Sequence, residues 1–481
     1  MANNPHTTGR YPAAMATPPA ARRPALILVS LALAQLIIAL DYSIVFVALP
    51  DIGSGIGFRG QDLQWVIGAY AVTFGGFLLL GGRLSDLLGR RQLFLTGLGL
   101  YALASAAGGL AATPAVLVAA RGLQGLGGAV LGPATLSLIT TMFAEGPERH
   151  RALGVWGAAG SSGLVAGALL GGVLTQALGW RAVFFVNVPL AAMVALLALR
   201  VVPAGPRAAR RSGLDVPGGL TATGGALLLV FGLVNGPQAG WAEPVTLGSF
   251  IAAAALLAVF LVIEARTAEP LVPLPVFGNR SLRIGTLITF MFMATFGASA
   301  YFITLALQQV RGWDALSTGL AYLLPCALVL AGTLIGGKMA TAIGVRATLV
   351  AGLATGAAGT ALFAAFLGSG STFGQMSPGI VVFSLAQGVV WTAMFAAATA
   401  GVPGRLQGLA SGLATSGQQV GAAVGLAVLV AVASAVAGPS PTLGRLSGGL
   451  QAAEYTSAAL ILLTAGLALA LPKAHRPAVR I

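Results

Sequence analysis

Charged residues are scarce in this chain, and their scarcity excludes a soluble domain. Only 8% of the 481 residues are charged, whereas 57% are hydrophobic and the mean hydropathy is +0.90. A domain that folds in water exposes far more charge than this. The composition therefore predicts an all-α polytopic membrane protein, because helices satisfy their own backbone hydrogen bonds inside a bilayer.

Cysteine and histidine are also rare. The single cysteine, Cys326, excludes a disulfide bond or a cysteine metal site within one chain. The three histidines, His6, His150 and His475, fall in predicted tails or loops, which argues against an intramembrane metal cluster. Residues 332–338 are similar to a phosphate-binding loop, but methionine follows them where Ser or Thr should hold magnesium. We therefore expect no metal and no other cofactor.

Apolar runs of about 20 residues, the length that spans a bilayer, recur along the sequence. Fourteen of them predict transmembrane helices, at residues 25–49, 63–81, 93–112, 115–136, 153–175, 182–200, 216–236, 246–264, 284–308, 317–335, 347–367, 377–400, 409–434 and 455–472. An even number of helices places both termini on one side. The flanking segments, 1–24 and 473–481, are expected to be tails on that side, the first of them disordered.

The basic residues are divided unequally between the two sides of this predicted topology. Of the 26 Lys and Arg residues, only Arg59, Arg181, Arg311 and Arg445 fall in loops on the side opposite the termini. By the positive-inside rule, the side that holds the termini is cytoplasmic. The net charge of +14 therefore reflects topology, and we expect no nucleic-acid partner. The predicted location is the cytoplasmic (inner) membrane.

A short charged segment between the second and third predicted helices carries a specific pattern. Residues 82–91 read Gly-x-Leu-Ser-Asp-x-x-Gly-Arg-Arg, and residues 337–346 repeat the glycine spacing with threonine in place of the aspartate. The first copy resembles the loop between the second and third helices of major facilitator superfamily transporters. The resemblance implies a gating cluster at this loop; a merely solvated basic loop is the alternative. The residues of the predicted gating loop are Gly82, Asp86, Gly89, Arg90 and Arg91.

The internal repeat predicts two related halves. A second repeated sequence supports this interpretation, because Gln124-Gly125 recurs as Gln387-Gly388. We expect two pseudo-symmetric six-helix bundles with an inserted helix pair between them. The predicted domains are the first bundle at 25–200, a linker with the inserted pair at 201–283, and the second bundle at 284–472.

Asp41 is the one acidic residue that this topology places inside a span, since Glu454 and the others fall in loops or at helix ends. A carboxylate inside a membrane must face a wet cavity, pair with a cation or be protonated, and each option makes it a candidate carrier of a proton or cation. The alternative is an aspartate at a helix end. Residues 40–50 resemble the first-helix signature of the fourteen-helix drug:proton antiporters, with Ser43 and Phe46 in place of its usual Thr and Asn.

Arg121 is the only basic residue predicted inside a span, and its depth is comparable to that of Asp41. Arg121, Gln124 and Gly125 resemble the fourth-helix motif assigned to proton transfer in this superfamily. The resemblance implies that Asp41 carries the proton and that Arg121 modulates it. A static buried ion pair that only holds helices together is the alternative. The candidates for lining a substrate cavity are Tyr42, Phe46, Gln124 and Gln308.

The fifth predicted helix is rich in glycine and resembles the motif associated with antiporters, except that Ala168 replaces its proline. The glycines that carry the resemblance are Gly154, Gly163, Gly167, Gly171 and Gly172. Three of them, Gly163, Gly167 and Gly171, recur every four residues and so form a groove along one helix face. A groove of this kind allows close helix packing in a membrane.

These features together predict a transporter and not an enzyme, because the sequence has neither a cluster of catalytic side chains nor a further soluble domain. The resemblance implies proton-coupled efflux of antibiotics or other amphipathic drug-like compounds by alternating access, which would confer resistance. A transporter of an endogenous metabolite or nutrient is the alternative. The expected partners are a small-molecule drug, protons and the lipid bilayer, and we expect a monomer.

Overall fold

The computed structural model describes residues 24–58, 62–143, 147–203, 215–267, 270–368, 370–402, 407–438 and 441–472. Within these residues every regular element is a helix or a helical turn. The predicted tail at 473–481, and that at 1–24 except for its last residue, lie outside the described residues. We call the end of the molecule that holds Pro24 the proximal end and the end that holds Ile56 the distal end.

The first part of the chain forms seven helices and one 3-10 turn. Their bounds are α1 (Pro24–Ile56), η1 (Asp62–Gln64), α2 (Trp65–Leu88), α3 (Arg90–Gly109), α4 (Pro114–Met142), α5 (Pro147–Leu178), α6 (Ala182–Phe185) and α7 (Asn187–Val201). The sequence encodes the start of α4 locally. Thr113 accepts a hydrogen bond from the backbone N–H of Val116, and Pro114 occupies the first helical position, where its missing N–H costs nothing.

A pair of antiparallel helices follows, α8 (Val216–Ala239) and α9 (Pro244–Arg266). Both begin with a proline in the first turn behind an acidic cap. Asp215 accepts from the backbone N–H of Gly218, and Glu243 accepts from those of Val245 and Thr246. The negative caps also oppose the positive end of each helix dipole.

The last part of the chain begins with a 3-10 turn and includes two π-helical segments. Its elements are η2 (Leu274–Gly278), α10 (Arg280–Phe292), η3 (Met293–Gly297), α11 (Ala298–Leu305), η4 (Ala306–Val310), α12 (Ala315–Ala321), α13 (Leu323–Ile343), α14 (Val345–Ala365), α15 (Phe373–Thr399), α16 (Gln407–Ala437) and α17 (Leu443–Ala468). The single apolar run predicted at 284–308 is thus one continuous helix with two π turns.

Within the described residues, 12 helical segments are long and apolar enough to cross a membrane. The helices α2 and α3 are not among them. Asp86 lies near the end of α2, and Arg90 and Arg91 open α3. The structure therefore does not confirm the predicted number of fourteen spans.

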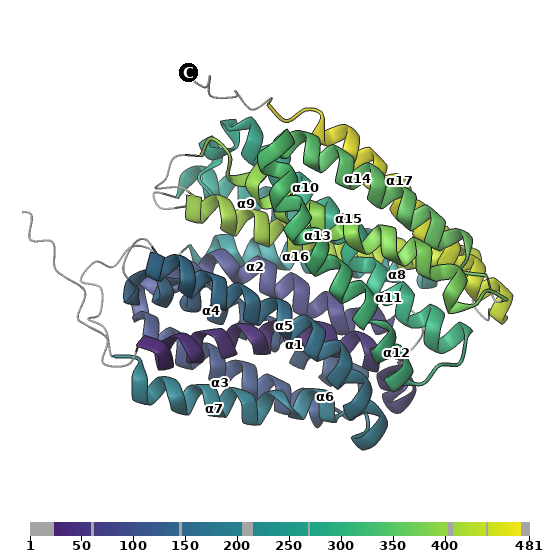
Figure 1. Ribbon diagram of the computed structural model, residues 1–481, viewed down its shortest axis with the longest axis horizontal. Coiled ribbons are helices and arrows are strands. Elements are labelled where there is room, and N and C mark those ends of the chain that lie inside the picture. Colours follow the sequence, from purple (N-terminus) through teal and green to yellow (C-terminus); the bar gives the residue numbers. More distant parts are fainter. Residues whose placement is uncertain are drawn as a thin grey trace, which may run out of the picture.

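Figure 1 shows the helices in two groups, with α1–α7 in one and α10–α17 in the other. In the first group α5 packs along α1, and α4 packs along α2 and α3. In the second group α15 packs along α13 and α14, and α17 packs along α14 and α16. Apolar side chains of both groups share one cluster, in which Ile44 and Phe46 of α1 join Phe302 of α11.

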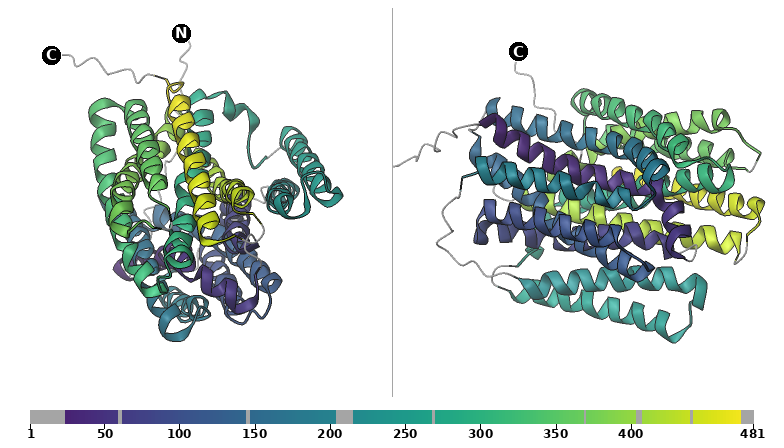
Figure 2. Two further views of the ribbon diagram at one scale, coloured as in Figure 1. Left: turned by 90° about the vertical axis from the view of Figure 1, so that its right-hand side faces the viewer. Right: turned by 90° about the horizontal axis from the view of Figure 1, so that it is seen from below.

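The pair α8–α9 lies beside the two groups, where Figure 2 shows it as a separate teal hairpin. α8 packs against α2 of the first group and α16 of the second, whereas α9 packs chiefly against α8. Val230 of α8 lies in one apolar cluster with Val72 and Ala422 of those two helices. The pair therefore covers the line along which α2 and α16 meet.

The segment predicted as a gating loop is mostly helical, which corrects that expectation. α2 continues to Leu88 and α3 begins at Arg90, so that Gly89 alone separates them, with a φ of 89°. The repeat copy behaves alike, since Gly344 separates α13 from α14 with a φ of 85°. Only glycine adopts such a φ without strain, which explains the shared glycine spacing of the two copies.

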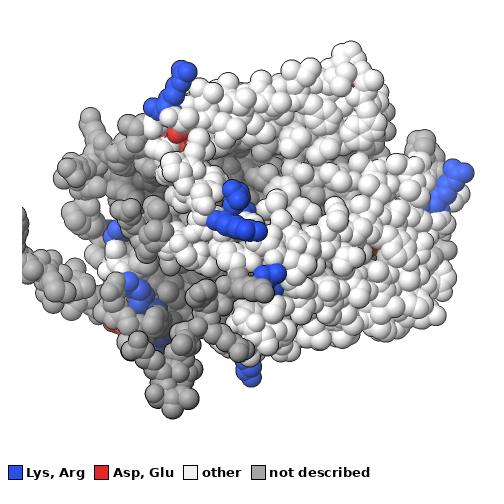
Figure 3. All heavy atoms as spheres, turned by 90° about the horizontal axis from the view of Figure 1, so that it is seen from above, with Lys and Arg blue, Asp and Glu red and all other residues white. Residues whose placement is uncertain are grey.

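The charged side chains are distributed unevenly over the surface. Figure 3 shows one broad face of the molecule, on which most blue Lys and Arg side chains lie in the left half. A further basic side chain lies at the right-hand end, and the area between is largely white. A long uncharged band between two charged ends is typical of a protein surface that faces lipid.

Candidate functional site

Asp41 lies near the middle of α1 and is completely buried, with 0% of its surface exposed. Its Oδ2 accepts a hydrogen bond from Nη1 of Arg121 over 2.6 Å, which is also an ion pair. Its Oδ1 accepts from Nε2 of Gln124 and from Nδ2 of Asn187, each over 2.8 Å. Both carboxylate oxygens are therefore satisfied, and the charge has a cation next to it.

Arg121 of α4 is also buried, with 2% of its surface exposed. Besides Asp41, its guanidinium donates to the backbone carbonyl of Val66 over 2.7 Å and to Oε1 of Gln124 over 2.7 Å. The ring of Tyr70 lies beneath it, 4.5 Å from the guanidinium carbon to the ring centroid. These contacts fix the planar fork of the arginine in one orientation.

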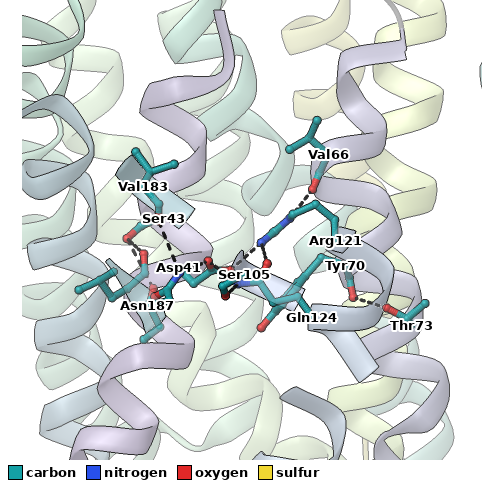
Figure 4. Close-up of polar contacts among 12 residues, drawn as sticks. Asp41, Ser43, Val66, Tyr70, Thr73, Ser105, Arg121, Gln124, Val183 and Asn187 are labelled. Carbon is teal, nitrogen blue, oxygen red and sulfur yellow. Dashed lines mark hydrogen bonds and ion pairs between the residues drawn. The ribbon is translucent and has the colours of Figure 1, made fainter. Parts of the chain in front are cut away.

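Residues of five helices take part in this network, and Figure 4 shows how their side chains point toward one another. α1 supplies Asp41, α2 supplies Tyr70, and α4 supplies Arg121 and Gln124. The amide of Gln124 also donates to the hydroxyl of Ser105 on α3 over 2.8 Å, and Asn187 opens α7. A change in the protonation of Asp41 would therefore be felt by most helices of the first group.

The hydrogen bonds to both carboxylate oxygens of Asp41 determine the chemistry of the site. A carboxylate that accepts three hydrogen bonds and pairs with an arginine is stabilised in its charged form. Movement of any of these donors would leave an acceptor position of Asp41 unfilled. Two polar atoms of the site, Oδ1 of Asn187 and Oη of Tyr70, are buried and form no hydrogen bond.

The other predicted cavity residues lie in different surroundings. Gln124 is fully buried within the Asp41 network and is not exposed to a cavity, which corrects the expectation for it. Tyr42 and Phe46 form an edge-to-face ring pair with centroids 5.5 Å apart, and Tyr42 is only partly buried. Gln308 lies in η4 of the second group, away from Asp41.

Gln308 joins the two groups of helices at the distal end. Its Nε2 donates to the backbone carbonyl of Val47 on α1 over 2.9 Å. It also lines a pocket of about 430 Å³ at this end, together with Pro50, Asp51, Ser54, Thr175, Gln176, Gln309, Trp313, Asp314 and Ala315. The backbone N–H of Ser317 donates to Asp314 and holds the pKa of that carboxyl below its usual range.

The glycines of α5 pack against two partners. A Cβ at Gly163 or Gly171 would come within 2.7 Å of the backbone carbonyl oxygen of Leu36 or Ile44, and one at Gly167 would overlap Leu40 and Ser43. This face therefore holds α1 at backbone contact. Gly172 points elsewhere, since its Cβ would lie 2.7 Å from the carbonyl oxygen of Ala315 in the second group.

Gly154 does not belong to this packing face, which corrects the prediction for it. A Cβ at Gly154 would meet no atom within 4 Å.

Of the predicted gating residues, Arg91 donates from Nη2 to the backbone carbonyl of Leu199 at the end of α7 over 2.7 Å. The surroundings of Gly82 and the side chain of Asp86 lie outside what the structure describes.

The structure shows three buried polar residues that are absent from the site predicted from the sequence. Asn187 and Ser105 complete the Asp41 network, and Glu454, expected at a helix end, is completely buried inside α17. A lone asparagine in an apolar run is a detectable signal for the first. Glu454 is missed because α17 begins at Leu443, in a stretch whose Gly, Ser and Gln residues lower its hydropathy. The described residues contain no group of three or more His, Cys, Asp or Glu that could hold a metal ion.

The model of the Major Facilitator Superfamily matches residues 31–426, and a second match covers residues 286–478. The chain therefore belongs to the major facilitator superfamily, whose members are multi-pass membrane transporters and not enzymes. It is 38% identical over 374 residues to the cephamycin export protein CmcT of Amycolatopsis lactamdurans, covering 77% of this chain and 76% of that protein. It is 37% identical over 336 residues to the puromycin resistance protein pur8 of Streptomyces alboniger, covering 70% of this chain and 66% of that protein.

Solved structures share the fold. The human organic anion transporter MFSD10 superposes with a TM-score of 0.60 at 19% identity, covering 94% of this chain and 100% of that one. PepTSo, a transporter of the POT family, superposes with a TM-score of 0.67 at 17% identity, covering 94% of this chain and 97% of that one. At these identities the likeness concerns the fold alone.

Proposed function

We propose that this protein exports antibiotics or related amphipathic compounds from the cell in exchange for protons, by alternating access. The observation that carries the proposal is the fully buried Asp41, held by Arg121, Gln124 and Asn187 within the membrane-spanning helices. A buried ionisable residue in a transporter marks the path of an ion or proton. The relatives named for cephamycin export and puromycin resistance support an antibiotic as the cargo.

Proton coupling follows from the partners of Asp41. Protonation neutralises the carboxylate, which removes its attraction to Arg121 and one of its acceptor sites. The freed donors of α4 and α7 then favour another arrangement of these helices against α1. Binding of the drug in the opened cavity and loss of the proton on the other side complete the exchange, because each ligand favours a different state.

The proposed topology has fourteen spans with both termini in the cytoplasm. The way α2 and α3 pack along α4 supports their inclusion as spans. Because the two helices run in opposite directions, including or omitting both leaves the termini on the same side. The proximal end is then cytoplasmic, which agrees with Arg90 and Arg91 at the start of α3.

The moving parts are, in this proposal, the bundles at 25–200 and 284–472, with α8–α9 as an insertion beside them. Gln308 with Val47, and Gly172 with Ala315, hold the two bundles together at the distal, extracellular end. The helices α1 and α5 would move as one rigid body, because the glycines of α5 hold the two backbones in direct contact. Tyr42 and Phe46 are the proposed wall of the drug cavity, and Arg90 with Arg91 belongs to the proposed gate.

Transport by the purified protein tests this function. We would reconstitute it in proteoliposomes as a monomer, impose a pH gradient and follow radiolabelled puromycin and a cephamycin. We expect uphill accumulation that collapses when a protonophore removes the gradient. Failure to concentrate any antibiotic of a broad panel, with proton-driven movement of a metabolite instead, would favour the endogenous transporter.

A further inference from the structure

Glu454 lies near the middle of α17, and 0% of its surface is exposed. The hydroxyl of Ser299 on α11 donates to its Oε2 over 3.1 Å. Its other oxygen, Oε1, is buried and has no hydrogen-bond partner. Within the described part of the chain, no Lys, Arg or His lies at ion-pair distance from this carboxyl group.

The elements packed around α17 bring no cation to Glu454. These elements are α10, α11, α14, α16 and the two π turns. The other titratable side chains on these elements and on α17 itself are Arg280, Arg283, Tyr301, Arg346, Arg445 and Tyr455, and Tyr322 follows the end of α12. The arginines all lie in the first turns of their helices, and Arg445 lies more than two turns before Glu454.

A charged carboxylate in this position has one hydroxyl donor and no counter-ion. Desolvation penalises the charged form heavily in such a place, and the group neutralises itself by binding a proton. The flanking residues Leu450 and Ala453 belong to an apolar cluster with Tyr301 and Phe302, so the carboxyl group lies next to largely apolar surroundings. A completely buried side chain offers no space to a drug molecule. The ligand of this carboxyl group is therefore a proton.

The surroundings of Glu454 also contain a means of releasing that proton. Ser299 follows the π turn Met293–Gly297 within one helical turn. π turns occur mostly at functional sites, and conversion of this one to an α turn would rotate Ser299 about the helix axis by about 100°. On α17, Gln451 and Ser447 precede Glu454 by three and seven residues and share its face toward the distal end.

We propose that Glu454 and Ser299 form a second proton-binding site, in the second group of helices and separate from Asp41. The site is occupied in the conformation described here. It exchanges its proton along the face of α17 when α11 shifts. The part of this site in transport rests on the proton exchange proposed above, whereas its occupancy by a proton does not.

Infrared difference spectroscopy of the full chain in lipid nanodiscs tests the occupancy without any drug. A protonated carboxyl group gives a carbonyl stretching band that deuterium exchange shifts. We expect the parent protein to show such a band at neutral pH, and Glu454→Gln to lose it. The isosteric amide keeps the hydrogen bond from Ser299. Asp41→Asn and Glu264→Gln are the matched controls, and the band should persist in both.

Ser299→Ala provides a second readout that does not alter the carboxyl group. Loss of the hydroxyl donor should move the position of the same band. A neutral-pH spectrum that Glu454→Gln and Ser299→Ala both leave unchanged would overturn the proposal. If the band belongs to Glu454 but the parent moves no drug against a proton gradient, the site stands and the proposed export function fails.

Discussion

Asp41 in the first group of helices and Glu454 in the second are both completely buried carboxyl groups, yet their partners differ. Three side chains donate to Asp41, and one of them is Arg121, whereas within the described residues Ser299 alone donates to Glu454. A cation therefore lies against the first carboxyl group and no described cation against the second. The comparison teaches that two equally buried acidic side chains of one protein can have very different polar partners.

The backbone packing of the two groups is alike, in contrast to their polar contents. Gly167 and its neighbours on α5 allow contact with α1. In the same manner, Gly417 and Gly421 on α16 allow contact with α10, and Gly425 allows contact with η3. The glycine spacing of four residues is the same in both. Close helix contacts at glycine therefore occur in both groups of helices, whereas the described residues show a charged network around Asp41 in the first group only.

The largest effect is expected from removing the cation next to Asp41. Arg121→Ala leaves a buried, charged carboxylate with amide donors only, and should lower the free energy of unfolding by about 3–5 kcal/mol. Thermal unfolding in detergent measures the loss. Lys338→Ala, which removes an exposed cation from α13, is the control and should change little.

The contrast between the two carboxyl groups also predicts which second substitution restores the stability lost in Arg121→Ala. The double variant Asp41→Asn with Arg121→Gln should recover most of the stability lost in Arg121→Ala, because no unpaired charge remains. Glu454→Gln should change the free energy of unfolding by less than about 1 kcal/mol, because a neutral amide replaces a neutral acid. A cost for Glu454→Gln as large as that for Arg121→Ala would show that Glu454 is charged.

A smaller and equal effect is expected at the glycine contacts of the two halves. Gly167→Ala and Gly421→Ala each force a methyl group into the backbone of a facing helix, and each should cost about 1–3 kcal/mol. Gly154→Ala, on the same helix as Gly167 but in open space, should cost nothing or stabilise α5. Unequal costs at Gly167 and Gly421 would contradict the structural equivalence of the halves.

The contact between the halves at the distal end should respond to a single hydrogen bond. Gln308→Ala removes the donor to Val47 and should shift the balance toward open distal ends by roughly 2- to 10-fold. Distances between spin labels on the distal ends of α5 and α12 report the populations. Gln309→Ala, in the same pocket, is the control, and an equal shift from both variants would contradict a specific role for Gln308.

The smallest effect concerns Asp314, which caps α12 beside this pocket. Because hydrogen bonds from Ser317 lower the pKa of Asp314, its cap is intact above the ordinary pKa of 3.8 and is lost as the pH falls below that value. The protection of the Ser317 amide from exchange, relative to its intrinsic rate at the same pH, should therefore fall in acid. In Asp314→Asn the exchange should show no such titration, and a titration that persists there would assign it to another group.

Much of the site could be predicted from single charged residues in apolar runs. Asp41 and Arg121 stand out because charge is costly in a membrane, and counting helix depth brings them to one level. Glu454 could not be found this way. The polar residues at the start of α17 lower the hydropathy of this segment, so that the predicted helix begins only after Glu454. Gly154 was wrongly included because sequence spacing does not tell which helix face a neighbour covers.

The fold could be predicted further than the number of its spans. The repeat of residues 82–91 at 337–346 correctly indicates equivalent glycine breaks at Gly89 and Gly344. The predicted loop around the first copy is wrong, because α-helical hydrogen bonding continues through charged residues once they leave the apolar layer. The helices α2 and α3, which the sequence predicts as spans, are not among the 12 candidate spans of the described residues.

The central claim is that Asp41 couples the proton gradient to drug movement, and one comparison tests it most directly. Binding and uphill transport of puromycin are measured in parallel for the parent, Asp41→Asn and the pocket control Asp51→Asn, at equal abundance in proteoliposomes. We predict that Asp41→Asn binds the drug without concentrating it, whereas the parent and Asp51→Asn do both. Uphill transport by Asp41→Asn at the parent rate would contradict the account and make the Asp41–Arg121 pair a structural one.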